Sequence, residues 1–122
     1  MPTDHQTPFI AAYLQMLEIA SAVKLLPGME SFGIDEKALF DAIMLAWGQS
    51  TPMTVRQAIG INGLGSPATL HKRLTRLRAM ELVTAVGVEG DRRTKFLGPT
   101  AKGLKYSEQL GQAFLQLVKS KS

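Results

Sequence analysis

Hydrophobic residues recur at intervals of three and four over much of this chain, a period typical of amphipathic helices. In the first such segment, residues 8–26, two apolar rows run side by side: Phe9, Tyr13, Met16, Ala20 and Val23, and next to them Ile10, Leu14 and Leu17. This stripe is wider than one face of a small domain needs. We therefore expect the helix either to be deeply buried or to pack against a second subunit.

Capping signals divide the middle of the chain into three further helices. We expect one at residues 35–47, with Asp35 as its N-cap and a hydrophobic staple between Ile34 and Leu39. Thr54 and Gln57 form a capping box for a short helix. After a glycine-rich turn at 60–65, Ser66 and Pro67 begin a helix that ends near Met80. A short helix, a turn and a second capped helix have the spacing of a helix-turn-helix.

The sequence then becomes strand-like. Residues 82–89 and 94–97 are rich in Val, Thr and Phe, which predicts two strands joined by a hairpin tip at 90–93. Met53 is placed to extend this sheet, and Thr100 caps a last helix. The predicted fold is mainly α with a small β-hairpin wing. Residues 1–122 are expected to form a single domain, with a winged helix-turn-helix core at 35–99 and flanking helices at 8–26 and 100–119 that dimerise.

The charge is unevenly distributed along the chain. The net charge is only +4, yet residues 51–106 hold ten basic residues against three acidic ones, and residues 1–50 hold two against six. A basic middle segment concentrates positive potential where a polyanion can bind. There are no cysteines, which excludes disulfides and thiolate metal sites and fits a reducing cytoplasm. We find neither a signal peptide nor a membrane-spanning segment, so we expect a cytoplasmic protein without a membrane partner.

The predicted fourth helix has two contrasting faces. Leu70, Leu74 and Leu77 fall on one side, and Thr69, Lys72 and Arg76 fall on the opposite side. Small residues at its start allow close approach to base edges, and the cations reach bases or phosphates. The candidate DNA contacts, which include three cations of the predicted wing, are Ser66, Ala68, Thr69, Lys72, Arg73, Arg76, Arg92, Arg93 and Lys95.

Arginines at the predicted wing tip suit a narrow minor groove. Asp91 is expected to pair with a neighbouring arginine and so to fix this tip. Taken alone, the basic helix face and the charged hairpin are each also typical of an ordinary solvated surface.

A second motif extends from the wing into the last predicted helix. Asp91-Arg92-Arg93 is followed by Pro99-Thr100 and Gly103, and Leu82-Val83 precede it. Together with the helix at 66–77, these motifs resemble the MarR family of bacterial winged-helix regulators, whose wing signature is Asp-x-Arg, then Leu-Thr and Gly. The resemblance covers roughly residues 35–105. This chain departs from the family pattern in three residues: Glu81 replaces a glycine, Pro99 a leucine, and Ala85 a frequent arginine. It also has room for only one long C-terminal helix.

The resemblance implies a DNA-binding transcriptional regulator. Such a protein acts as a homodimer on double-stranded DNA, with repression as the default role, the recognition helix in the major groove and the wing in the minor groove. The family also implies a ligand pocket between the dimer helices and the winged domain. Tyr13, Phe32 and Trp47 are candidates to line it, with a small aromatic effector as the ligand. Such aromatic residues are more often simply part of the core.

Other function classes have less support in the sequence. The two histidines, His5 and His71, cannot build a Ser-His-Asp arrangement or a zinc site. We therefore expect no catalytic residue, no metal and no cofactor. The alternative to a regulator is a winged-helix protein-interaction module without specific DNA binding, because one fold serves many functions.

Overall fold

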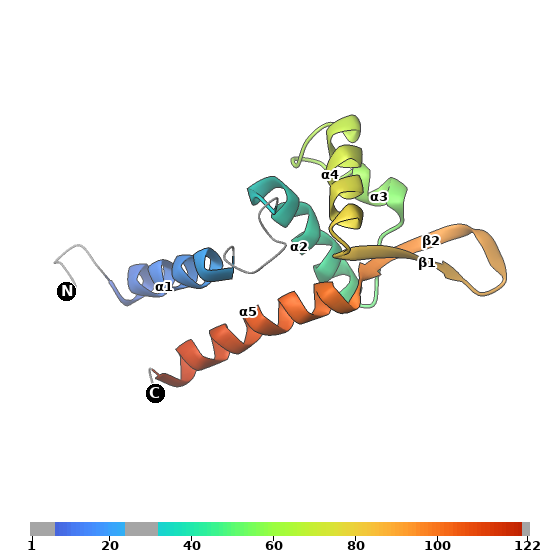
Figure 1. Ribbon diagram of the computed structural model, residues 1–122. Coiled ribbons are helices and arrows are strands. Elements are labelled where there is room, and N and C mark those ends of the chain that lie inside the picture. Colours follow the sequence, from blue (N-terminus) through green and yellow to red (C-terminus); the bar gives the residue numbers. More distant parts are fainter. Residues whose placement is uncertain (1–6, 24–31, 121–122) are drawn as a thin grey trace. The chain divides into compact units, whose positions relative to one another are not determined.

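The structure is a computed structural model that describes residues 7–23 and 32–120 of the chain (Figure 1). The chain divides into two compact units, one of residues 31–105 and one of residues 1–30 and 106–122. The helix-turn-helix and the wing both belong to the first of these units. The predicted end of the first helix, at residues 24–26, lies outside the described residues.

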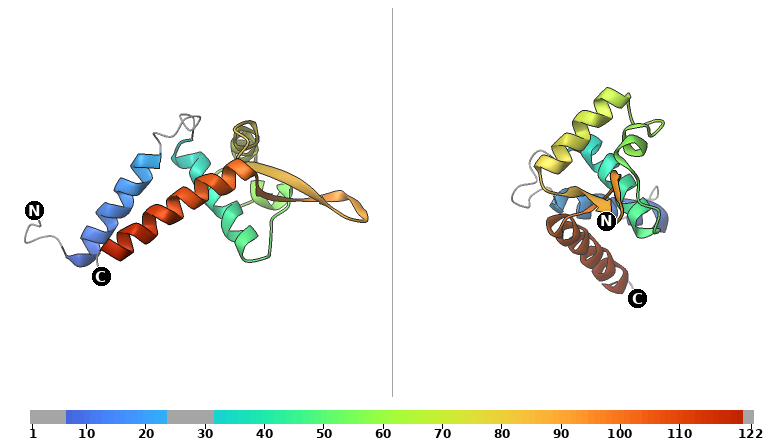
Figure 2. Two further views of the ribbon diagram at one scale, coloured as in Figure 1. Left: turned by 60° about the horizontal axis from the view of Figure 1, so that its bottom comes forward. Right: turned by 90° about the vertical axis from the view of Figure 1, so that its right-hand side faces the viewer.

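The unit of residues 31–105 has the predicted mainly helical fold with a small hairpin. Its elements are α2 (Ile34–Gly48), α3 (Val55–Ile59), α4 (Pro67–Ala79), β1 (Val83–Val88), β2 (Asp91–Pro99) and the start of α5 (Ala101–Ser120). Helix α2 packs against α4 and β2, and α3 packs beside α4. The hairpin extends away from these three helices (Figures 1 and 2). The buried hydrophobic core of this unit is Phe32, Leu39, Phe40, Ile43, Ala58, Leu70, Leu74, Leu77, Leu82, Val83 and Leu97.

The predicted caps of the helix-turn-helix are confirmed. The Thr54 hydroxyl accepts from the Gln57 N–H at 3.2 Å, and the Gln57 side chain accepts from the Thr54 N–H at 2.9 Å. The Ser66 hydroxyl accepts from the Thr69 N–H at 3.2 Å, with Pro67 as the first helical residue. These bonds satisfy N–H groups that the first turn of a helix leaves without partners.

The predicted N-cap of α2 is wrong by two residues. Gly33 is the N-cap, no side chain caps the helix, and Asp35 lies inside the first turn. Ile34 is 78% exposed, so the staple with Leu39 does not form. The Asp35 carboxylate lies instead near the guanidinium of Arg73. Asp35 therefore contacts α4 through Arg73 and does not cap its own helix.

The wing is longer, and its turn tighter, than predicted. Strand β1 pairs antiparallel with β2, with a bulge between Gly87 and Val88. The turn is Glu89–Gly90, and Asp91 to Arg93 already belong to β2, so the predicted tip at 90–93 is wrong. Gly90 has a φ of +85°, which glycine adopts without strain. On the other side of β2, the Leu97 N–H donates to the Met53 carbonyl at 2.8 Å, so Met53 does extend the sheet.

The passage from α4 to β1 contains a strained residue. Glu81 follows the C-cap Met80 and has a φ of 61°, the left-handed conformation in which helices usually place a glycine. Its carbonyl accepts a short hydrogen bond from the Thr100 hydroxyl, and the Thr100 N–H donates to the Leu82 carbonyl at 3.1 Å. Thr100 also caps α5, as predicted, because its hydroxyl accepts from the Gly103 N–H at 3.0 Å.

Replacing Glu81 by glycine should stabilise the protein. The substitution removes the steric cost of the left-handed conformation, and we expect a gain of about 0.5–1 kcal/mol in the free energy of unfolding. Urea denaturation of Glu81→Gly measures it. Glu81→Gln is the control, since it removes the charge and keeps the strain. An equal gain in both variants would show that the charge, and not the backbone, is responsible.

The other unit contains α1 (Pro8–Val23) and most of α5. The Thr7 hydroxyl accepts from the Ile10 N–H at 3.2 Å and so caps α1. Much of the apolar stripe of α1 is exposed within the single chain, and so is part of that of α5: Phe9, Ile10, Tyr13, Leu14, Met16, Leu17, Phe114 and Leu115. None of the described helices combines the length and hydrophobicity that crossing a membrane requires.

Candidate nucleic-acid interface

Helix α4 buries its leucines and presents a polar face to solvent. Leu70, Leu74 and Leu77 are buried between α4 and the rest of the unit. On the side turned away from them lie Ala68, Lys72 and Thr75, all exposed. Within the described part of the chain Lys72 forms no ion pair, so its ammonium is available to a partner. This part of the predicted DNA-contacting set therefore lies on an accessible surface.

Arg73 contributes to the architecture of the helix-turn-helix. Its Nη1 donates to the Leu64 carbonyl at 2.7 Å, and its Nη2 lies 3.5 Å from an Asp35 carboxylate oxygen. Its side chain is only 21% exposed. A guanidinium used in this way fixes the turn before α4 to the start of α2. Its geometry supports a structural role for Arg73 and does not favour the predicted direct contact with DNA.

Arg76 forms an ion pair between α4 and α2. Its Nη1 donates a short hydrogen bond to Oε1 of Glu36. The carboxylate side chain of Glu36 is 7% exposed and the side chain of Arg76 is 57% exposed. Arg76 therefore reaches solvent with part of its guanidinium while the rest is held by a buried anion. The helical period of the sequence identifies Arg76 as a surface cation but could not reveal this partner.

The environment of Glu36 favours its charged form. Burial alone would raise the pKa of this carboxyl, but the hydrogen bond and charge of Arg76, with backbone hydrogen bonds at Gly33 and Glu36, lower it below its usual value. A carboxyl whose pKa is lower in the folded state stabilises the fold at neutral pH and loses that contribution as the pH falls. Glu36 is thus an anion at physiological pH, directly beside α4.

The wing presents a second group of cations. Arg92, Arg93 and Lys95 are exposed at the start of β2, next to the turn. The Asp91 carboxylate accepts from the N–H groups of Arg93 at 2.9 Å and Thr94 at 3.2 Å, which fixes the backbone that carries the arginines. The pKa of Asp91 is lowered, first by the Thr94 side chain and then by these N–H groups. Asp91 therefore fixes the wing through backbone hydrogen bonds and not through the predicted arginine side chain.

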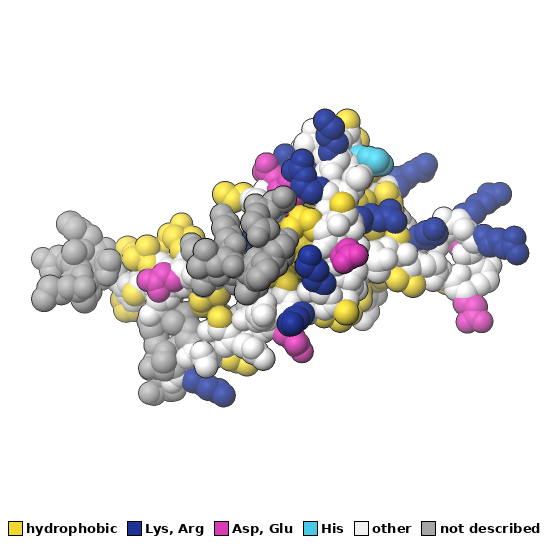
Figure 3. All heavy atoms as spheres, viewed as in Figure 1, with side chains coloured by type: hydrophobic (Ala, Val, Ile, Leu, Met, Phe, Trp, Pro, Cys, Tyr) yellow, Lys and Arg dark blue, Asp and Glu magenta, His cyan; other side chains and the backbone are white. Residues whose placement is uncertain are grey.

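Basic side chains gather over α4 and along the hairpin in the space-filling view (Figure 3). Ser66 and Thr69 lie at the start of α4, where the Ser66 hydroxyl also donates to the Thr69 hydroxyl at 2.9 Å. Their hydroxyls are therefore already engaged in the helix cap.

Sequence reasoning missed Arg56, which is exposed on α3, the first helix of the helix-turn-helix. Its position was a usable signal, because the first helix of such motifs crosses the DNA backbone.

The aromatic residues considered for an effector pocket have separate surroundings. Phe32 is buried and packs edge to face on Phe40, with ring centroids 5.9 Å apart. Trp47 is 43% exposed, and its indole lies against Gly98 of β2. Tyr13 lies on α1, in the other unit, and is 54% exposed. Phe32 therefore fits the core alternative.

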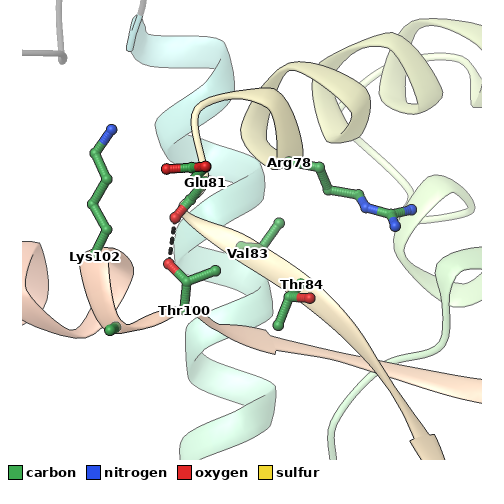
Figure 4. A pocket seen from close by; sticks show the side chains of 7 residues that line it. Arg78, Glu81, Val83, Thr84, Thr100 and Lys102 are labelled. Carbon is green, nitrogen blue, oxygen red and sulfur yellow. Dashed lines mark hydrogen bonds between the residues drawn. The ribbon is translucent and has the colours of Figure 1, made fainter.

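A shallow cavity of about 540 Å³ does occur where α4, β1 and α5 meet. It is lined by Arg78, Glu81, Val83, Thr84, Thr100, Ala101 and Lys102. Lys102 donates to the Met80 carbonyl at 2.8 Å, and the cations of Arg78 and Lys102 point away from each other (Figure 4). With its cations diverging and an acid between them, the cavity is not built to hold an anion.

Several solved structures of other proteins are similar to this chain in fold. No protein-family model and no curated protein matches the chain. Among solved structures, S. aureus MepR in complex with DNA is 18% identical, with a TM-score of 0.62 over 93% of this chain and 86% of that one. RV1404 from Mycobacterium tuberculosis is 16% identical, with a TM-score of 0.61 over 92% and 74%. Streptococcus pneumoniae FabT in complex with DNA is 19% identical, with a TM-score of 0.56 over 93% and 77%. The chain therefore has the winged helix-turn-helix fold of MarR-type regulators.

Proposed function

We propose that the protein is a transcriptional regulator that binds double-stranded DNA with α4 and the wing. The observation that carries the proposal is the pair of cationic surfaces on one unit, the outward face of α4 around Lys72 and the exposed arginines of β2. Two of the similar structures, MepR and FabT, are complexes with DNA. Because likeness of fold alone does not fix function, the proposal depends on these residues.

The exposed residues suggest how the duplex is contacted. Ala68, Lys72 and Thr75 face the major groove, where the short side chains let the helix approach base edges. Arg92 and Arg93 reach into the adjacent minor groove, whose negative potential attracts arginine. Arg56 and Lys95 bind flanking phosphates, which fix the protein's register on the DNA.

We further propose that the protein acts as a homodimer and represses transcription. The exposed apolar stripe of α1, with Phe9 at 85% and Tyr13 at 54% exposure, supports a second subunit, because monomers rarely leave such a stripe in water. A symmetric dimer would read two half-sites about 34–36 Å apart, one helical turn of DNA. Repression would follow from blocking access of the polymerase. A small aromatic effector stays a prediction of the family resemblance.

Selection of bound duplexes from a random pool tests the function directly. The proposal expects enrichment of a roughly palindromic site, with half-sites about one turn apart. Light scattering on the same sample should give twice the mass of one chain. Failure to enrich any duplex would contradict sequence-specific DNA binding. Enrichment of a single, non-repeated half-site by a protein with the mass of one chain would contradict the proposed dimer.

A further inference from the structure

We infer that Glu36 is a specificity-determining residue, which restrains Arg76 and so limits how strongly α4 binds DNA of any sequence. The inference rests on the proposed function and concerns how the same surface discriminates between sites. Glu36 would touch no DNA; it would act through Arg76. It is a positioning residue, built into α2 and directed at α4.

In the contact between Glu36 and Arg76, the acid is the fixed partner and the arginine is the partner that is positioned. Glu36 lies in the first turn of α2 and is almost wholly buried, so its carboxylate cannot turn to another partner in solvent. Arg76 is the longer and more exposed member of the pair, and it reaches across from α4 to the acid. The buried anion therefore determines where the guanidinium lies, and the rotational freedom of Arg76 is reduced.

The same pattern repeats one turn earlier on α4. Arg73 lies near Asp35, and Arg76 bonds Glu36, so two neighbouring acids at the start of α2 face two arginines on one flank of α4. Lys72, on the outward face, forms no ion pair with any residue that the structure describes. Lys72 therefore contributes a full positive charge to the DNA-facing side. The charges of Arg73 and Arg76 are largely neutralised by the two acids. Binding of DNA without regard to sequence depends on the number of available cations, so the acids lower it.

Specific binding is affected differently. The side chain of Arg76 is 57% exposed, and its hydrogen bond to Glu36 uses Nη1, which leaves Nε and Nη2 to donate to a partner. A guanidinium held in one place can bind a phosphate only when the helix sits in the matching register. A released guanidinium would adapt to phosphates in many registers. Restraint of Arg76 should therefore raise the ratio of specific to non-specific affinity.

Glu36→Gln tests this inference, because glutamine keeps the size of the side chain and one acceptor oxygen and removes its charge. Affinity is measured by fluorescence anisotropy on a duplex selected from the random pool and on a scrambled duplex of equal length. We expect binding to the scrambled duplex to tighten about fivefold near 0.1 M salt, and its salt slope to steepen by about 0.9. The specificity ratio should fall. A protein that was merely destabilised would bind both duplexes more weakly.

Asp41→Asn is the matched control. Asp41 lies on the same helix but pairs with Lys37 at 2.6 Å and not with α4, so this variant removes the same charge and frees a cation elsewhere. It should tighten scrambled-duplex binding less than about twofold. An equal effect of the two variants, or unchanged binding by Glu36→Gln, would overturn the inference. If the unchanged protein binds neither duplex, the proposed function itself fails.

The double variant Glu36→Gln with Arg76→Gln covers the case in which a single change unfolds the chain. It keeps the net charge and replaces the ion pair by two amides that can hydrogen-bond. We expect unchanged affinity for the scrambled duplex and about tenfold weaker binding of the selected one, since one fixed phosphate contact is lost. Equal affinities of this variant and the unchanged protein for the selected duplex would likewise contradict the inference.

Discussion

Removing Lys72 and Arg93 together should weaken binding of the selected duplex about 100-fold or more near 0.1 M salt. Lys72 is exposed on the outward face of α4, and Arg93 is exposed on the wing. Each alanine removes one cation from the DNA interface, so the slope of log affinity against log salt should become shallower by about 1.8, or about 0.9 per cation. Salt titrations followed by fluorescence anisotropy measure both quantities.

The control for this prediction is Lys37→Ala with Lys105→Ala. It removes the same total charge from α2 and from the start of α5, away from the outward face of α4 and the wing. We expect a loss below about fivefold, because only the long-range attraction is reduced. Equal losses in the two double variants would mean that net charge, and not the proposed face, governs binding.

Replacing Gly103 by alanine should have the largest effect on the fold. A Cβ at this position would lie 2.2 Å from the Leu82 carbonyl oxygen, a backbone atom that also accepts from the Thr100 N–H. Relieving the clash requires moving α5 away from the start of β1, where the wing joins α4. We expect a loss of about 2–4 kcal/mol in the free energy of unfolding. Urea denaturation and thermal melting measure it.

Gly111 offers a matched control on the same helix. A Cβ there has no atom within 4 Å, and the residue lies inside α5. Gly111→Ala should stabilise the protein by about 0.5–1 kcal/mol, since alanine is the better helix former. If Gly103→Ala melted at the temperature of the unchanged protein, the close packing of α5 on Leu82 would be disproved.

Local signals in the sequence predict much of the fold. The limits of α4 follow from Ser66 and Pro67 at its start and from the leucine period that ends near Met80. The caps at Thr54 and Thr100 are equally predictable, because their partners lie three residues away. The wing turn is predicted too late because Asp91 and the arginines resemble a loop, whereas Glu89–Gly90 makes the turn and a bulge absorbs the change of register.

Contacts between distant segments cannot be predicted in the same way. Asp35 has the usual features of an N-cap, and only the packing of α2 against α4 assigns it to Arg73. Glu36 and Arg76 are 40 residues apart in sequence, so no periodicity connects them. Glu81 occupies a position where the MarR pattern has glycine, and the structure supplies the reason for that glycine, a left-handed backbone.

Directed DNA cleavage tests most directly whether α4 and the wing bind the same duplex together. The chain has no cysteine, so single cysteines at Thr75, Glu89 and Asp41 can each carry an iron-EDTA reagent without background. We expect cleavage inside the half-site from Thr75→Cys, cleavage in the flanking minor groove from Glu89→Cys, and none above background from Asp41→Cys. Cleavage from the α2 position with none from α4 or the wing would contradict the claim.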